Sequence, residues 1–326
     1  MLSCKQKHRL PEIPPTLISE KVPHDSDDPA IWVNRENPEE SIVFGTDKDE
    51  INGGVYAFDL DGKIIRSLSV TGLGYPNNID VTYGFRRSDS SLTDLLVFSE
   101  RVKQQIRIFA LPEMIPVDKG GIAVFTDESR AGFRRPMGVS FYSNPHNDKH
   151  YVFVSRKIGP DTGYIYQYEL VSDGIDVVAT LVRKFGKFSG LKEIEAIAVD
   201  HELGYVYYGD EGIGIRKYHA DPAKGDQEIS LFGGEYFTDD IEGICIVRKE
   251  GSEGFLIVSD QGDSSFNIFR RDDNTFVKKI NLGTESTDGC DVTNKALGNK
   301  FPNGLFVSMN DQRNFFYHAL DSLKLD

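Results

Sequence analysis

The hexapeptide Thr-Asp-Asp-Ile-Glu-Gly, residues 238–243, leads directly into the apolar run Ile-Cys-Ile-Val at residues 244–247. Side chains of an extended segment point alternately to its two faces, so Asp240 and Glu242 are expected on the same face. Two neighbouring carboxylates repel one another unless a cation or a proton lies between them. An acidic pair at the start of a buried strand therefore indicates a candidate site for an oxygen-preferring metal ion.

The same arrangement recurs along the chain. Acids or amides stand beside β-rich runs at residues 27–33 (Asp-Asp-Pro-Ala-Ile-Trp-Val), 77–81 (Asn-Asn-Ile-Asp-Val), 194–199 (Ile-Glu-Ala-Ile-Ala-Val) and 288–292 (Asp-Gly-Cys-Asp-Val). Residues 137–142 (Met-Gly-Val-Ser-Phe-Tyr) keep the apolar pattern without an acid. These segments make six openings spaced by roughly fifty residues, a period typical of propellers and other repeat arrays.

Each opening is followed by a β-rich segment that ends in polar residues and then by a segment rich in aromatic residues. The middle segments are expected at residues 41–48, 95–101, 151–157, 205–211, 255–261 and 305–311, and the aromatic ones at 54–60, 105–111, 163–170, 214–219, 265–270 and 314–320. No helical periodicity of useful length is present. Units of three or four strands cannot bury their faces alone, so they must pack on one another.

We therefore predict an all-β fold, a six-bladed β-propeller, as a single domain over residues 23–326 with a central channel. A long β-sandwich or two tandem barrels would not explain a sixfold repeat. Residues 1–22 contain three prolines after Leu10 and are predicted to form an extended lead-in that can supply a strand to close the last blade.

Composition narrows the class of partner. The 326 residues carry a formal charge of −14, which argues against nucleic acid and suits a protein that holds cations, although charge alone is more typical of mere solubility. No apolar run is long enough for a membrane span. Three cysteines are too few for a disulfide framework, and Cys245 and Cys290 are expected to be buried thiols.

The start of the chain bears on location. Residues 1–10 are polar and basic without an apolar core, so the given chain shows no signal peptide. Cys4 could be the remainder of a lipoprotein cleavage site, or the start could be a plain cytosolic one. We expect an extracellular or periplasmic protein, with Cys4 as a candidate lipid anchor.

Equivalent positions of a propeller form rings around its axis. The middle segments end in Lys48, Arg101 and Lys157 in the first three units, and in Asp210-Glu211, Asp260-Gln261 and Asn310-Asp311 in the last three. The openings contribute Asp28, Asp80, Glu195, Asp240, Glu242 and either Asp288 or Asp291. Salt bridges across the channel are one interpretation. The other is a site with two parts, in which carboxylates hold several Ca²⁺ ions and the cations bind a polyanion.

Other chemistries find no support. The seven histidines form no zinc-hydrolase pair, and neither a nucleophile elbow nor a phosphate-binding loop is present. Gly212 and Gly214 lack the third glycine and the following helix of a dinucleotide fingerprint. The single tryptophan, Trp32, is expected in the core.

The combination of segments 27–33, 77–80 and 240–243 with Gln261-Gly262 and Ser264-Ser265 resembles the β-propeller (alkaline) phytases. The resemblance runs in order from about residue 25 to the C-terminus. It implies a calcium-dependent six-bladed propeller that releases phosphate from myo-inositol hexakisphosphate (phytate), of the 3-phytase type. It further implies a monomer that takes its substrate as a calcium complex, with several Ca²⁺ ions as cofactor.

The resemblance also implies roles for individual residues. Lys48, Arg101 and Lys157 match phosphate-binding cations. Glu211, Asp240 and Glu242 are implied as catalytic, and the residues that match metal ligands are Asp28, Glu195, Glu211, Asp240, Glu242 and Asp288 around the catalytic calcium cluster and Asn78, Asp80 and Gln261 nearer the channel. The implied reaction is attack on phosphorus by a water that calcium activates.

The chain departs from the family pattern in three places. Met137 stands where a tyrosine is usual, Ala196 follows Glu195 where glycine is usual, and residues 120–136 bring in Arg130, Arg134 and Arg135. These changes bear on substrate affinity more than on the reaction. Two other functions stay open, a calcium-dependent propeller lactonase or esterase and a non-catalytic calcium-stabilised binding propeller.

Overall fold

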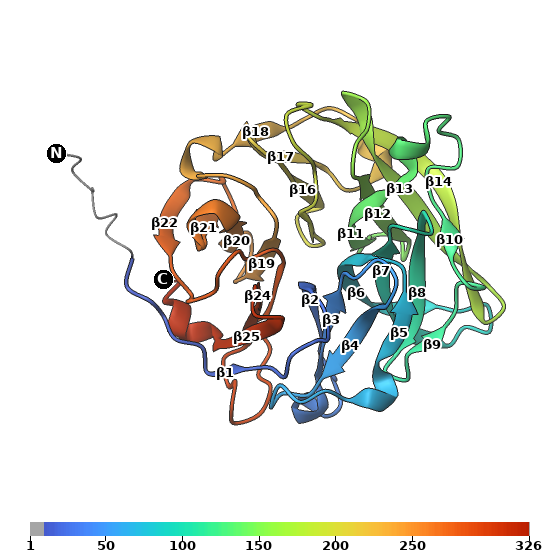
Figure 1. Ribbon diagram of the computed structural model, residues 1–326. Helices are drawn as coiled ribbons and strands as arrows, with labels where there is room; N and C mark the ends of the chain where they lie inside the picture. The colour runs from blue at the N-terminus through green and yellow to red at the C-terminus, as the bar shows by residue number, and fades with distance from the viewer. Residues whose placement is uncertain (1–9, 326) are drawn as a thin grey trace.

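A computed structural model describes residues 10–325 as six antiparallel sheets around a central axis (Figure 1). We number these sheets blade 1 to blade 6. The first three are β2 (Ser26–Trp32), β3 (Ile42–Asp47), β4 (Gly53–Phe58) and β5 (Val70–Leu73); β6 (Pro76–Arg86), β7 (Leu92–Glu100), β8 (Gln105–Leu111), β9 (Ile115–Pro116) and β10 (Ile122–Ala123); and β11 (Pro136–Ser143), β12 (His150–Arg156), β13 (Thr162–Asp173) and β14 (Asp176–Lys187). The others are β15 (Ile197–Asp200), β16 (Tyr205–Asp210), β17 (Gly214–His219) and β18 (Ser230–Phe232); β19 (Ile244–Arg248), β20 (Gly254–Asp260), β21 (Ser265–Arg270) and β22 (Phe276–Ile280); and β23 (Cys290–Thr293), β24 (Leu305–Asn310), β25 (Asn314–Ala319) and β1 (Leu17–Ile18).

The described helices are all short 3₁₀ segments in the connections between strands. They are η1 (Pro38–Glu40), η2 (Arg66–Leu68), η3 (Ala131–Arg134), η4 (Pro222–Lys224), η5 (Gly234–Tyr236), η6 (Gln261–Asp263) and η7 (Leu320–Leu323). Within residues 10–325, no helix has the length and apolar character to cross a membrane. Cys4, the candidate lipid anchor, and the first nine residues of the lead-in lie outside the described residues.

The six-bladed propeller predicted from the sequence is confirmed. The strands expected at residues 105–111, 214–219 and 265–270 are β8, β17 and β21 with the same bounds. The outermost strands were not predicted individually, because strands such as β14 are largely exposed and lack a clear apolar pattern. Exposed strands give a weak alternation signal, since neither face is fully buried.

Six apolar clusters form the core, and each lies between two neighbouring blades. The cluster between blades 6 and 1 includes Phe58 and Phe315, whose rings meet edge to face with centroids 5.6 Å apart. Trp32 packs between blades 1 and 2, and its indole nitrogen donates to Asp94 Oδ2 at 2.9 Å. Burial between blades rather than within one blade is the reason the sheets must form a ring.

The N-terminal segment completes the last blade. β1 pairs antiparallel with β25, with Leu17 opposite Tyr317 and Ile18 opposite Phe316. Backbone hydrogen bonds from Ser19 to Phe315 and from Val22 to Arg313 extend this pairing. Blade 6 therefore joins the first and the last strands of the described residues, and Figure 1 shows the blue strand β1 beside the red strand β25.

The interface between blades 6 and 1 provides a test of ring closure. A Cβ atom at Gly45 would lie 2.3 Å from the buried ring of Phe315, so Gly45→Ala must displace that ring. We expect the free energy of unfolding in urea to fall by about 1–3 kcal/mol. The smaller side chain of Phe315→Leu should recover part of this loss when both changes are combined. A Gly45→Ala protein as stable as the parent would contradict the close packing at this interface.

Candidate active site

The site forms where the innermost strands begin, at one end of the channel. The ladders of β2, β6 and β11 each shift register near their first residues, between 26 and 29, between 76 and 79, and between 136 and 139. A β-bulge of this kind places an extra residue in one strand and redirects its side chains. Two successive residues, rather than alternate ones, can therefore reach the axis at positions 27–28 and 77–78.

The first acidic cluster joins blades 1 and 4. Asp27, Asp28 and Glu195 each offer one carboxylate oxygen within 4.8 Å of the others, and all three are buried. Asn77 of blade 2 donates from Nδ2 to Asp27 Oδ2 at 2.7 Å and to Glu195 Oε1 at 2.5 Å. Burial, together with the charge of Asp27, raises the pKa of Glu195 to about 7. The cluster favours a cation or a proton among its oxygens.

The second acidic cluster lies where residues 238–243 meet the end of β16. Glu211, Asp240 and Glu242 also offer oxygens within 4.8 Å of one another. Ile241 lies between the two acids and is only 1% exposed, so the expected alternation holds at this point. Burial and the nearby charges of Glu193 and Asp240 raise the pKa of Glu211 to about 9. Burial and neighbouring acids likewise raise the pKa of Glu242.

Asp288 connects the acidic clusters to the cations. Lys48 Nζ lies 2.9 Å from Asp27 Oδ1 and 2.5 Å from Asp288 Oδ2. Gln261 donates from Nε2 to Asp288 Oδ1 at 2.5 Å. Burial alone would lower the pKa of Lys48, but the carboxylates of Asp27 and Asp288 outweigh it, and the net pKa is raised. Lys48 therefore keeps its positive charge beside the acids.

Arg101 and Lys157 continue this row of cations along blades 2 and 3. The guanidinium of Arg101 contacts Asn77 Oδ1 and the sulfur of Met137, and it lies 4.1 Å from the ring centroid of Tyr75. Lys157 Nζ lies 2.5 Å from a carboxylate oxygen of Glu193. Ion pairs and acid clusters thus coexist at this end of the channel. The ion pairs agree with the interpretation of salt bridges across the channel, and the interpretation of a site for calcium and a polyanion stays a prediction.

The arginines of the 120–136 segment have mixed surroundings. Arg134 donates to the carbonyl of Glu128 at 2.7 Å, and Arg130 stacks on Phe133 at 4.2 Å. Arg135 is exposed, and its carbonyl accepts a hydrogen bond from the backbone of Lys157 at 2.8 Å. Arg135 is therefore the arginine of this segment whose backbone is joined directly to the row of cations.

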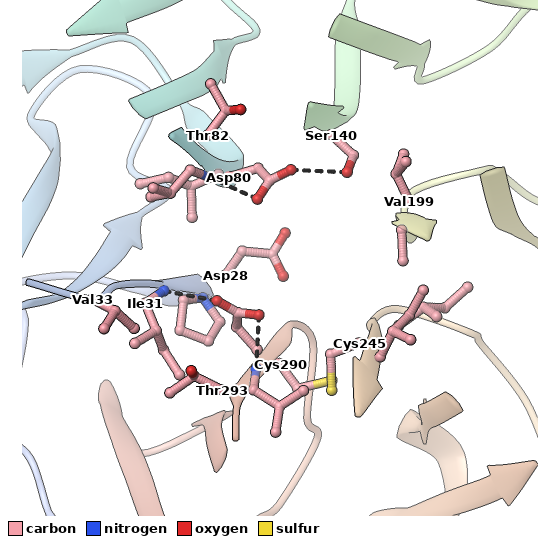
Figure 2. A pocket seen from close by; sticks show the side chains of 18 of the residues that line it. Asp28, Ile31, Val33, Asp80, Thr82, Ser140, Val199, Cys245, Cys290 and Thr293 are labelled. Carbon is pink, nitrogen blue, oxygen red and sulfur yellow. Dashed lines mark hydrogen bonds between the residues drawn. The ribbon is translucent and has the colours of Figure 1, made fainter. Parts of the chain in front are cut away.

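Asn78 and Asp80 line the channel itself, a cavity of about 650 Å³. Asp80 accepts hydrogen bonds from Ser140 Oγ and from the backbone of Phe141 and Val81, at 2.7 to 2.8 Å, and burial raises its pKa to about 6. Figure 2 shows Asp80 and Asp28 projecting into this space from neighbouring blades. Asp80 is part of neither acidic cluster.

Three polar residues of the site were not among the predicted ones. Asp27 is adjacent to Asp28, and in a regular strand only one of two adjacent side chains points to a given face. The bulge at positions 27–28 removes that restriction, so both acids reach the axis. Asn77 acts through contacts to other blades, which a single sequence does not display. Glu193 stands two residues before Glu195, so alternation was a signal that could have found it.

The donor atoms of both clusters suit a hard cation. All six are carboxylate oxygens, the ligands that Ca²⁺ prefers. Asp28 Oδ2 and Glu211 Oε1 are buried and have no hydrogen-bond partner among the described residues. Buried charges without a partner are costly, and a bound cation would compensate them. The residues present therefore fit calcium.

Buried acidic clusters beside a row of cations at one end of the channel define the class as a six-bladed β-propeller with a charged central site. A family model described as "Phytase" matches residues 16–316. The "3-phytase" of Bacillus subtilis (strain 168) is 31% identical over 302 residues, which cover 88% of this chain and 75% of the relative. The WD40 β-propeller domain of Doa1 superposes with a TM-score of 0.50 over 95% of each chain at 12% identity, which shows the fold alone. The chain belongs to the phytase family.

The raised pKa of a buried channel acid, Asp291, predicts how the free energy of unfolding depends on pH. Burial raises the pKa of Asp291 from 3.8 to about 7. Between these values the folded state binds more protons than the unfolded chain, so the free energy of unfolding falls as pH rises. In chelator, we expect urea unfolding to show this decline between pH 4 and pH 7, roughly the two pKa values, and Asp291→Asn to flatten it. An unchanged slope in the variant would contradict the assignment.

Proposed function

We propose that this protein is a calcium-dependent phosphomonoester hydrolase that releases phosphate from phytate. The observation that carries the proposal is the pair of buried, oxygen-only acidic clusters next to a row of cations, in a member of the phytase family. The name of the Bacillus relative, "3-phytase", supports both the substrate and a 3-phytase type of reaction. We also propose a monomer whose catalytic domain spans residues 23–326.

The metal ligands that we propose extend those of the two clusters. They are Asp27, Asp28, Asn78, Asp80, Glu195, Glu211, Asp240, Glu242, Gln261 and Asp288. Several calcium ions held there would supply positive charge against phosphate oxygens and a water of lowered pKa. Among these residues, Glu211, Asp240 and Glu242 are the proposed catalytic ones, as the family resemblance implies, and Glu211 Oε1 is buried without a hydrogen-bond partner among the described residues.

The cations of the first three blades account for substrate binding. Lys48, Arg101 and Lys157 follow the middle strands of successive blades, so they form an arc along one side of the acids. A substrate with several phosphates could contact more than one of them. The planar guanidinium of Arg101 suits two phosphate oxygens at once, and the lysines act as point charges. Charge that develops on the phosphoryl oxygens would be stabilised by the same groups.

Net charge affects the form in which the substrate binds. A chain with a formal charge of −14 repels a free polyanion over long distances. A phytate whose charge is partly neutralised by calcium avoids much of this repulsion, which is the reason for proposing a calcium complex as substrate. A lactonase or esterase would need a less charged cleft, and no histidine of the described residues belongs to either acidic cluster.

Phosphate release from calcium-phytate near neutral pH, with and without EDTA, tests the proposal directly. We expect release that EDTA removes and added Ca²⁺ restores. No release combined with a chelator-sensitive melting temperature would replace the proposal with a calcium-stabilised binding propeller. Release that does not respond to EDTA would refute the metal requirement.

Substitutions in the second cluster test the catalytic assignment. Glu211→Gln and Asp240→Asn keep side-chain size and remove a charge that holds the cation, so phosphate release should fall by about 100-fold or more. Asp239→Asn is the matched control, because Asp239 is adjacent, exposed and outside the cluster, and it should retain near-parental activity. Circular dichroism should show intact folds. Full activity of either cluster variant would contradict its role.

A further inference from the structure

Two thiols lie side by side in the wall of the channel, and neither belongs to the two acidic clusters. Cys245 belongs to β19 of blade 5, and Cys290 belongs to β23 of blade 6. Both are free and buried, both line the 650 Å³ cavity, and their side chains contact one another. Figure 2 shows the two sulfur-bearing side chains together at this wall. Phosphate ester hydrolysis with oxygen ligands leaves these thiols without a role.

The thiol pair is held in place from both sides. The ladder of blade 5 pairs Cys245 with Ile257, and the ladder of blade 6 pairs Cys290 with Ser308. Both cysteines also pack in the apolar cluster between these blades. Two sulfurs positioned by separate strands form a preorganised pair, so little ordering is needed when an ion binds between them.

The chemistry of sulfur selects a different ion from that of the acidic clusters. Thiolates are soft ligands that bind ions such as Zn²⁺, whereas Ca²⁺ takes oxygen ligands. In tetrahedral zinc sites each metal–sulfur bond is about 2.3 Å, which brings two ligating sulfurs into contact with each other. A contacting thiol pair therefore suits one ion of this class and not calcium.

We propose that Cys245 and Cys290 form a second metal site, selective for a thiophilic divalent cation. Two S–H bonds break, two metal–sulfur bonds form, and two protons pass to solvent, so no oxidant or reductant is required. The cavity side of the pair leaves the remaining coordination positions to water.

Burial, Cys290 and Asp291 raise the pKa of the Cys245 thiol, so the pair keeps its protons until a cation displaces them, and the negative charge nearby attracts such a cation. The carboxylate of Asp28 lies near Cys290, and that of Asp291 lies near Cys245. Both acids line the same cavity as the thiols, so the route to the site carries negative charge. A channel lined by one sign of charge raises the local concentration of the opposite ion.

Cadmium is the probe, because cadmium thiolates have an ultraviolet charge-transfer band that cadmium carboxylates lack. The full chain, reduced and in excess Ca²⁺ so that the acidic clusters are saturated, is titrated with Cd²⁺. We expect a band that saturates at one ion per chain. Cys245→Ala and Cys290→Ala should each weaken Cd²⁺ binding by ~10-fold or more, and the double variant should abolish the band.

Cys4→Ser is the matched control, since it removes the third thiol of the chain and should leave the band unchanged. Protection of Cys245 and Cys290 from alkylation by Cd²⁺, mapped by mass spectrometry, tests the parent protein even if the alanine variants fail to fold. The proposal is overturned by a parent protein without the band, by a band that Cys4→Ser removes, or by displacement of all Cd²⁺ by Ca²⁺. None of these outcomes depends on phytate hydrolysis.

Discussion

Burial between blades is the constraint on which the whole structure depends. No blade has a partner for its faces except the blades beside it, and each of the six apolar clusters is shared by two neighbours. The ring must therefore close, and closure brings the first residues of six inner strands to one axis. Residues that are far apart in the chain, such as Asp28 and Glu195, become neighbours for this reason alone.

Closure also creates an electrostatic cost, because it gathers carboxylates in a buried space. The raised pKa values of Glu195 and Glu211 express that cost. Close backbone approach makes the crowding sterically feasible. A Cβ atom on Gly289 would lie 1.3 Å from Asp28 Oδ1, so a larger residue there would displace the acid. The cations along the first three blades offset part of the repulsion between the carboxylates. Asp28 Oδ2 and Glu211 Oε1 still have no hydrogen-bond partner among the described residues, so a further positive charge would be favourable there.

Much of this arrangement was accessible from the sequence, because it follows from periodicity. The fifty-residue repeat predicted six blades, and two-residue alternation predicted that Asp240 and Glu242 share a face, as they do. The prediction fell short where local geometry breaks the period. Asp27 joins the first cluster through a bulge, and Asn77 bridges it through side-chain contacts between blades. Outer strands such as β14 were not predicted one by one, since their exposure removes the apolar alternation.

The pairing of Leu17 with Tyr317 also has a consequence for biosynthesis. A growing chain emerges from the ribosome with its N-terminal end first, so β1 must wait until β25, at the other end of the described residues, has been made. Contacts between such distant positions form slowly, because a long loop must be closed before they contribute. The seam between blades 6 and 1 also separates Asp288 from Asp27, both of which contact Lys48. The nascent protein therefore completes this part of its site only after translation has reached the final blade.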